Sequence, residues 1–245
     1  FGYTSNVTLV ELSNINNPLL RQFSETCPGS FQHSMQVSNL ATAAAQEINA
    51  NVQLARTGSL YHDIGKMLNP VFFVENQSGL NPHDSLTPEE SAAIIRKHVT
   101  DGLKLAHKHK LPLVIRDCIR SHHGNGPVRY FYTKFKNEHP DEPVPDVFFY
   151  EGDLPMSKET AILMMADAVE ASSRSLKTYT EESIAGLVDK IIDNQIAEGL
   201  YKHVPITFRD LEKLKSVFKS KITSFYHARI TYPEAQGVTQ PPLIE

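Results

Sequence analysis

The 245-residue sequence has few cysteines, no long apolar run and no excess of basic residues. Its two cysteines, Cys27 and Cys118, exclude the disulfide framework of small secreted proteins and favour a reducing compartment. No run of about 18 apolar residues occurs, so we expect no insertion of this chain into a membrane. The net charge of −4 argues against binding of a nucleic-acid polymer, which needs a basic surface.

Helical patterns dominate the chain and predict an all-α fold. Residues 87–90 combine an N-cap, a proline at the first helical position and a capping box, which is a strong helix start. Apolar and polar residues alternate over 8–12, a pattern that predicts a short edge strand. Other helices are expected over 30–49, 53–67, 112–124, 157–176 and 207–229, with one more starting near Thr180.

The chain divides into three expected parts: a lead-in over 1–30, one domain over 31–232 and a tail over 233–245. Within the domain, residues 124–156 are rich in proline and aromatic residues and interrupt the helical pattern. Long connections of this kind are usually lids or binding loops, so we expect a lid here. The chain begins at Phe1 with no signal peptide, which indicates a fragment or a processed product.

Eleven histidines are the most unusual feature of the composition. A single histidine on a helix is usually an ordinary polar residue. We interpret in this way His107, His109, His139, His203 and His227. The His62-Asp63 pair and Asp167 differ, because each carboxylate lies in an otherwise apolar helix. Burial of an ionised carboxylate is costly unless it is paired or binds a metal, so a shared cation is the best explanation.

The ordered set of histidines and aspartates resembles the HD superfamily of metal-dependent phosphohydrolases, in its version with five histidines and two metals. The set consists of His33, His62, Asp63, His98, His122, His123 and Asp167. Three flanking segments, 61–66, 75–84 and 157–167, resemble one branch of that superfamily. The branch is the seven-transmembrane HD proteins of PgpH type, whose cytoplasmic HD domain hydrolyses cyclic-di-AMP. The similarity covers residues 14–232.

The resemblance implies a helical bundle with a dinuclear metal site in its core. One metal would be held by His33, His62, Asp63 and Asp167. Asp63 would bridge to a second metal, held by His98, His122 and His123. Such nitrogen and carboxylate ligands suit octahedral iron or manganese better than four-coordinate zinc. Two metals about 3.5–4 Å apart would hold a shared hydroxide in line with a phosphodiester.

The charges of such a site favour an anionic substrate. Two divalent metals, two aspartates and one hydroxide leave one positive charge, which attracts a phosphodiester although the whole protein is acidic. Lys66 lies one turn after Asp63, and we expect it to contact phosphate and take part in catalysis; an exposed helix lysine is the alternative. Arg174 either contacts substrate or forms an ion pair with Glu170.

Other candidate substrate contacts come from loops and aromatic residues. His83 either reaches the leaving oxygen or only shapes the turn around Pro82. Tyr130, Tyr132 and Tyr150 are candidates for stacking on nucleobases, which is worth about 1–3 kcal/mol per base. Core packing is the alternative role of each tyrosine.

Three alternative functions agree less well with the sequence. Cyclic-di-GMP phosphodiesterases of the superfamily carry Gly-Tyr-Pro after the paired histidines, where this chain has Gly124-Asn125-Gly126. Hydrolases of alarmones and deoxynucleotides use a single metal, which would leave His98 and the His122-His123 pair unexplained. A domain that senses a nucleotide without catalysis needs no two-metal nucleophile.

The sequence therefore predicts a phosphodiesterase that opens cyclic-di-AMP to the linear dinucleotide pApA. The preference for adenine rests on the resemblance alone. The resemblance also predicts a cytoplasmic domain of a cell-membrane protein, tethered to transmembrane helices that lie outside this sequence.

Overall fold

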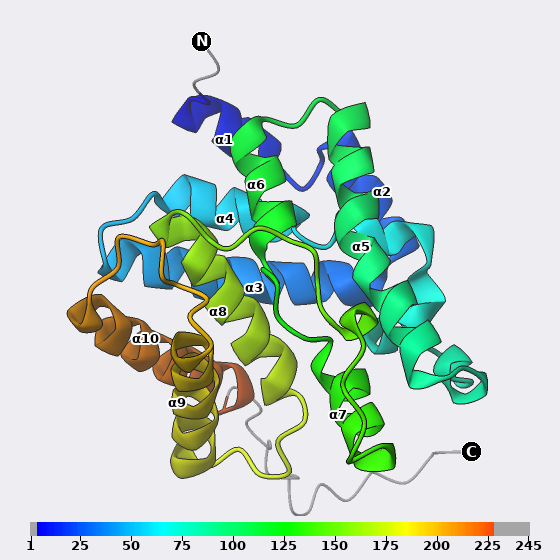
Figure 1. Ribbon diagram of the computed structural model, residues 1–245. Helices are drawn as coiled ribbons and strands as arrows, with labels where there is room; N and C mark the ends of the chain where they lie inside the picture. Colours follow the sequence, from blue (N-terminus) through cyan, green and yellow to red (C-terminus); the bar gives the residue numbers. More distant parts are fainter. Residues whose placement is uncertain (1–3, 228–245) are drawn as a thin grey trace, which may run out of the picture.

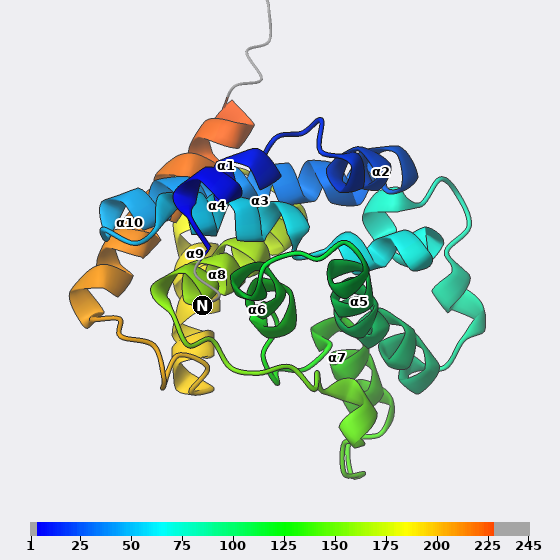
Figure 2. The ribbon, with the colours of Figure 1, turned by 90° about the horizontal axis from the view of Figure 1, so that it is seen from above.

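Residues 4–227 are described by a computed structural model, in which helices account for nearly all regular structure (Figures 1 and 2). The α-helices are α1 (Asn6–Leu12), α2 (Pro18–Thr26), α3 (Pro28–Glu47), α4 (Val52–Tyr61), α5 (Pro88–Lys108), α6 (Leu113–Ser121), α7 (Arg129–Glu138), α8 (Lys158–Ser173), α9 (Glu181–Ala197) and α10 (Phe208–His227). Short 3₁₀ segments are η1 (Ile64–Leu68), η2 (Pro70–Phe72), η3 (Val74–Asn76), η4 (Pro82–Ser85) and η5 (Asp146–Phe148). Between residues 4 and 227 the β-type pairing is a single isolated bridge, from Pro127 to Phe149. The predicted all-α fold is confirmed.

The long helix α3 lies at the centre, and the other helices are arranged around it (Figure 1). Helices α4 and α8 pack against α3, and α9 and α10 cover α8 and the C-terminal part of α3. Helix α6 packs against α4, α5 packs against α6 and η1, and α7 packs against α5. Three apolar clusters fill the spaces between these helices, and the polar residues of the site lie where the clusters meet.

The helix starts follow the sequence signals. Thr87 caps α5 through the capping box that the sequence indicates, and the structure shows a reciprocal capping pair of Ser157 and Thr160 at the start of α8. Thr180 caps α9 in the same way. An N-cap of this kind stabilises a helix by about 1 kcal/mol, which fixes where α5 and α8 begin. The positions of His98 and Asp167 along these helices follow from those starts.

Two expectations for the N-terminal region were wrong. Residues 8–12 belong to helix α1 and not to a strand, because the Ser5 hydroxyl accepts a hydrogen bond from the Thr8 amide and so caps a helix. Helix α3 begins at Pro28 rather than at Ser30, since proline fits the first helical position. The Ser30 hydroxyl donates instead to the Glu75 carboxylate.

The expected continuous helix over 53–67 ends earlier. Helix α4 stops at Tyr61, and the chain continues through His62 and Asp63 into the tighter 3₁₀ segment η1. At this point Gly65 meets the backbone of α5: a Cβ on it would lie 1.9 Å from the carbonyl oxygen of His98. Because Gly65 has no side chain, the 3₁₀ segment after Asp63 can lie closer to α5 than a residue with a Cβ atom would permit.

Residues 124–156 are more regular than the expected loop. They contain α7 and η5, because Phe131 and Phe135 are spaced for one helix face and pack with the buried ring of Phe148. A role as a lid stays a prediction. The described part of the lead-in, residues 4–30, packs into the apolar cluster of α4 and α6. The expected tail, 233–245, lies outside the described residues.

Two further features bear on chemistry. Cys27 and Cys118 are buried, as expected of small core residues, and burial raises the pKa of each thiol to about 12. Across residues 4–227, no helix has both the length and the apolar content needed to cross a bilayer.

The contact between Gly65 and α5 gives a first prediction. Replacing Gly65 with alanine should destabilise the protein by about 1–3 kcal/mol, because the new methyl group overlaps backbone atoms that cannot move without shifting α5. Urea unfolding measures this change. Gly186→Ala is the matched control: nothing lies near its Cβ position on the exposed face of α9, so stability should rise by up to about 1 kcal/mol. Equal stability of Gly65→Ala and wild type would contradict this account.

Candidate metal centre

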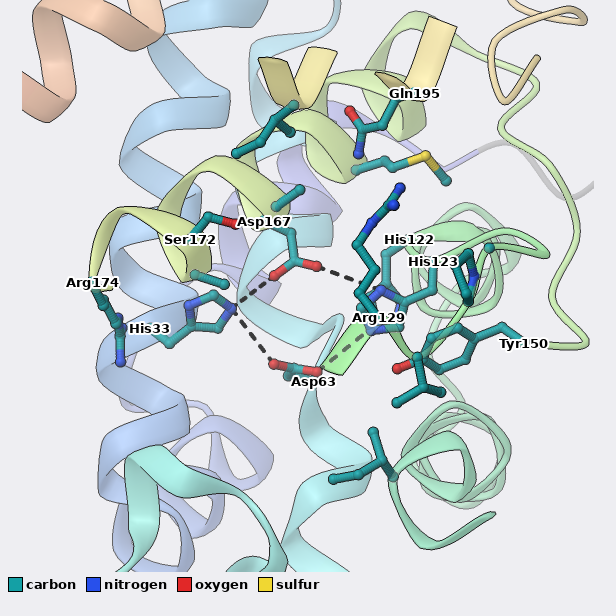
Figure 3. A pocket seen from close by; sticks show the side chains of 18 of the residues that line it. His33, Asp63, His122, His123, Arg129, Tyr150, Asp167, Ser172, Arg174 and Gln195 are labelled. Carbon is teal, nitrogen blue, oxygen red and sulfur yellow. Dashed lines mark hydrogen bonds and ion pairs between the residues drawn. The ribbon is translucent and has the colours of Figure 1, made fainter. Parts of the chain in front are cut away.

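The seven residues singled out by the sequence lie together in the structure. Figure 3 labels His33, Asp63, His122, His123 and Asp167. They come from α3, α5, α8 and the C-terminal ends of α4 and α6. Their order is His33 on α3, His62 and Asp63 after α4, His98 on α5, His122 and His123 after α6, and Asp167 on α8. All are buried except His123, which keeps 27% of its side-chain surface exposed. The structure brings the seven residues together, and their role as metal ligands stays a prediction.

One group of ligand atoms gathers around Asp167. His33 Nε2 lies 2.9 Å from Asp167 Oδ1, and His62 Nε2 lies 3.6 Å from the same oxygen. Asp63 adds its Oδ2 atom at 3.2 Å from His62 Nε2. Histidine nitrogens and carboxylate oxygens at such separations can surround one divalent cation.

A second group gathers on the other side of Asp63. His98 Nε2 and His122 Nε2 are 3.0 Å apart, and His123 joins them within ligand distance. The Oδ1 atom of Asp63 lies 3.4 Å from His98 Nε2 and 3.8 Å from His122 Nε2. The two oxygens of one carboxylate therefore face two different groups of imidazoles.

Hydrogen bonds from the backbone fix the orientation of three of the imidazoles. The Nδ1 atoms of His62, His98 and His122 each lie 2.7 Å from the carbonyl oxygen three residues earlier in the chain. Because a carbonyl only accepts, each Nδ1 donates its proton, and each Nε2 atom points into the site. His33 is held in the same way by a carboxylate, since its Nδ1 lies 2.5 Å from Glu170 Oε2. This outer support is typical of metal-binding histidines.

The donor set fits a divalent metal. His62 Nε2 is buried and has no hydrogen-bond partner among the described residues. The Nε2 atoms of His98 and His122 face each other with their lone pairs, since both Nδ1 protons point to carbonyls. Buried polar atoms are normally satisfied, and a cation between these nitrogens would remove both conflicts. The site can therefore hold a divalent metal.

The two groups differ in proton affinity when no metal is bound. Burial alone lowers the pKa of His33 and His62, but nearby carboxylates outweigh it. As a result the pKa of His33 is raised, and that of His62 is raised to about 10 by Asp63 and Asp167. Burial together with neighbouring charges lowers the pKa of His98 and His122 and brings that of His123 down to about 3.

A cavity of about 700 Å³ opens above this cluster. Six of the seven residues line it, while His62 is fully buried behind them. The opposite wall consists of side chains from α9, and the rim includes Arg129 and Tyr150 (Figure 3). The volume lies within the range of about 300–1,000 Å³ common for small-molecule sites.

Lys66 does not lie on an exposed helix face, which was the alternative to a phosphate contact. Its Nζ lies 2.7 Å from Asp63 Oδ2 and 2.8 Å from Glu75 Oε1, and it sits over the ring of Phe73. Burial disfavours its charge, but the two carboxylates raise the pKa of Lys66. Lys66 also lines the cavity, and an ammonium group has three donors, so one remains for a ligand.

Two other predicted contacts line the cavity. The Tyr150 ring stacks on the His123 ring with centroids 4.2 Å apart. Arg174 forms an ion pair with Glu170, in which Arg174 Nη2 lies 2.6 Å from Glu170 Oε1. This ion pair was the alternative to a substrate contact, although Arg174 also lines the cavity. The Glu170 carboxylate thus joins Arg174 to His33. No sequence pattern indicates this contact of Glu170 with His33, since only the fold brings together two residues 137 positions apart.

The remaining candidates lie outside this cavity. His83 Nε2 donates to the carbonyl oxygen of Phe72, and its ring packs on Phe131, which agrees with a role in shaping the turn. Tyr130 is 73% exposed. Tyr132 lines a smaller neighbouring pocket of about 390 Å³. We assign no substrate contact to these three side chains.

The helical fold and its buried cluster of histidines and aspartates define the class of protein. The chain belongs to the HD-domain family, whose model matches residues 30–172.

Among named relatives, the cyclic-di-AMP phosphodiesterase PgpH of Bacillus subtilis is 41% identical over 236 residues, which cover 96% of this chain and 33% of that protein. The Listeria monocytogenes protein of the same name is 41% identical over 235 residues, with 96% and 33% covered. The crystal structure of the Listeria PgpH HD domain in complex with cyclic-di-AMP matches with a TM-score of 0.82 and 40% identity. That match covers 88% of this chain and 100% of the Listeria chain. The present chain thus spans about a third of the length of the curated relatives.

The raised pKa values give a second prediction. His62 is protonated in the metal-free protein at neutral pH, so binding of Mn²⁺ should release at least about one proton per protein molecule, and the raised pKa of His33 adds to the release. Affinity should therefore increase as the pH rises from 6 toward the pKa of His62, about 10. Calorimetry in buffers of different ionisation enthalpy measures the number of protons released.

The exposed variant His109→Gln is the control and should release the same number as wild type. His62→Gln should release about one proton fewer. Metal binding without proton release in the wild type would contradict this description of the site.

Proposed function

We propose that this HD domain is a metal-dependent phosphodiesterase that hydrolyses cyclic-di-AMP to linear pApA. The observation that carries the proposal is Asp63, whose two oxygens face two groups of imidazoles at the base of one cavity. The relatives agree with it, because two proteins 41% identical to this chain are named cyclic-di-AMP phosphodiesterases. The similar Listeria HD domain forms a complex with that nucleotide.

Two divalent metals, manganese or iron, would occupy the two groups. The first would be held by His33, His62, Asp63 and Asp167. The second would be held by His98, His122, His123 and the other oxygen of Asp63. When bound, such metals supply a nucleophile from water at neutral pH and offset the negative charge that develops on a phosphodiester.

The protein's own residues would orient the reactants. The carbonyl bonds to His62, His98 and His122 hold the imidazoles rigidly, so little reorganisation accompanies catalysis. Lys66 would use its remaining N–H donor for a phosphate oxygen while its other two stay on Asp63 and Glu75. Hydrolysis breaks one phosphorus–oxygen bond of the ring, with water supplying the new oxygen and the proton for the leaving group.

Two aromatic or basic side chains at the cavity would contact the rest of the substrate. Tyr150 lies against His123 and offers its ring to a ribose or a base. Arg174 keeps its role toward Glu170, and its Nη1 group would be directed to a phosphate at the rim.

We further propose that the domain is attached to transmembrane helices in the full-length protein and lies on the cytoplasmic side of the cell membrane. The resemblance to seven-transmembrane HD proteins supports this, and the curated relatives are about three times as long as the matched region. Membrane fractionation of the full-length gene product tests the proposal, and recovery in the soluble fraction would count against it.

The third prediction concerns activity. Purified protein loaded with Mn²⁺ or Fe²⁺ should convert cyclic-di-AMP to pApA, and Asp63→Ala should lower kcat by at least about 1,000-fold, since both metal groups lose a ligand. Chromatography of the product with parallel metal analysis measures both properties, and two metal equivalents are expected in the wild type. Asp141→Ala is the control, because this exposed aspartate lies outside the cavity, and its activity should be unchanged.

The outcomes separate the candidate functions. Tight binding of cyclic-di-AMP by metal-loaded wild type, without any linear product, would show a sensor domain instead of an enzyme. One equivalent of zinc in the active protein would contradict the two-metal site.

A further inference from the structure

The cavity extends past the metal centre to a wall that the proposed chemistry does not use. This wall is formed by α8, α9 and Leu200 after α9, and it is mainly apolar, with small residues on α8 that leave room for a flat ring. Its apolar members are Met164, Ala168, Ala171, Leu187, Ile191 and Leu200. A planar heterocycle fits such a surface, because apolar walls with few polar groups are typical of sites for aromatic ligands.

One buried polar side chain interrupts this wall. Gln195 is 5% exposed, and its amide is oriented by Tyr201, whose hydroxyl donates to Gln195 Oε1 at 2.5 Å. Burial raises the pKa of Tyr201 well above its usual value, so the hydroxyl stays a donor. The amide oxygen is therefore occupied, and the amide nitrogen must lie on the opposite side.

The nitrogen of Gln195 is directed into the cavity (Figure 3). Among residues 4–227 it has no hydrogen-bond acceptor, although the side chain is nearly fully buried. Gln195 Nε2 is thus a donor at the cavity wall that no protein acceptor occupies, and an acceptor atom of a bound ligand can pair with it.

We propose that Gln195 selects the base of the substrate by donating a hydrogen bond from Nε2 to the N1 atom of an adenine. The inference rests on the proposed function and names a specificity-determining residue within it. Adenine N1 is an acceptor, whereas guanine N1 carries a proton. A guanine in the same pose would place a donor against the Gln195 donor and leave both unsatisfied in a buried site.

The geometry also explains why the residue is a glutamine held by a tyrosine. An unrestrained amide could rotate by 180° and offer its oxygen to guanine N1–H. The Tyr201 hydroxyl opposes this rotation, because its proton would lose the amide oxygen that accepts it. Tyr201 is thus a positioning residue that acts through Gln195.

Gln195→Glu tests the proposal directly, since it keeps the oxygen that accepts from Tyr201 and replaces the donor by an acceptor. In the manganese-loaded protein, kcat/KM for cyclic-di-AMP should fall by about tenfold or more. The ratio of kcat/KM for cyclic-di-GMP to that for cyclic-di-AMP should rise by a similar factor. Gln195→Met, which has no donor or acceptor, should lower the first value without the gain for guanine.

Two controls separate specificity from structure. Gln46→Glu makes the same chemical change at an exposed position on α3 and should leave both rates unchanged. Tyr201→Phe frees the amide and should reduce discrimination between the two nucleotides while the metal content stays at the wild-type level. Unchanged discrimination in Gln195→Glu and Gln195→Met, with wild-type metal content, would overturn the proposal.

Binding of the linear dinucleotides distinguishes this failure from failure of the proposed function. Calorimetry with pApA and pGpG on the manganese-loaded wild type and Gln195→Glu reports base selection without turnover. One outcome is that the wild type hydrolyses neither cyclic dinucleotide but prefers pApA to pGpG, and that Gln195→Glu lacks this preference. This outcome would refute the proposed enzymatic function and support the base contact. The other outcome is that the wild type hydrolyses cyclic-di-AMP, while the wild type and Gln195→Glu bind pApA with equal affinity. This outcome would refute the base contact alone.

Discussion

The burial of the Asp63 carboxylate is the constraint on which the rest of the site depends. An ionised carboxylate that is 2% exposed needs compensating positive charge or metal, because its desolvation otherwise costs several kcal/mol. Lys66 supplies part of this compensation, and the imidazoles on both sides supply ligand atoms. Burial by itself raises the pKa of Asp63, but the charges of His62 and Lys66 outweigh desolvation and hold that pKa well below its usual value. The carboxylate therefore stays charged and available to a cation.

The helical bundle provides the positions that this carboxylate requires. Two of the ligand pairs follow directly after α4 and α6, where the chain leaves the helix and both neighbours can turn toward the centre. Gly65 lets this segment lie directly against α5, which brings His98 to Asp63. Packing of α8 on α3 sets Asp167 beside His33. Fold and site are thus determined by the same contacts.

Much of this could be predicted from the sequence because the signals are local or carried by residue type. Capping residues such as Thr87 and Ser157 mark helix starts, and the ordered histidines and aspartates indicate one metal centre. The helix over 6–12 was missed because a short amphipathic helix and a short strand share the same alternating residues, and Ser5 decides between them. The partners of Lys66 were missed because Glu75 lies on a different 3₁₀ segment.

Glu170 and Gln195 show where prediction from sequence ends. Each is an ordinary polar residue on an amphipathic helix, and its role appears only from contacts with His33 or Tyr201 and from the cavity between α8 and α9. These roles arise from tertiary packing, which no local pattern encodes. Packing places Glu170 where it supports the metal-binding candidate His33, and it places Gln195 as a polar group in the cavity wall.

Anomalous diffraction from crystals of the manganese-loaded protein tests the central claim most directly. The account predicts two manganese peaks on either side of Asp63, one contacted by His33, His62 and Asp167 and the other by His98, His122 and His123. A single fully occupied peak, or two peaks that share no oxygen of Asp63, would contradict it.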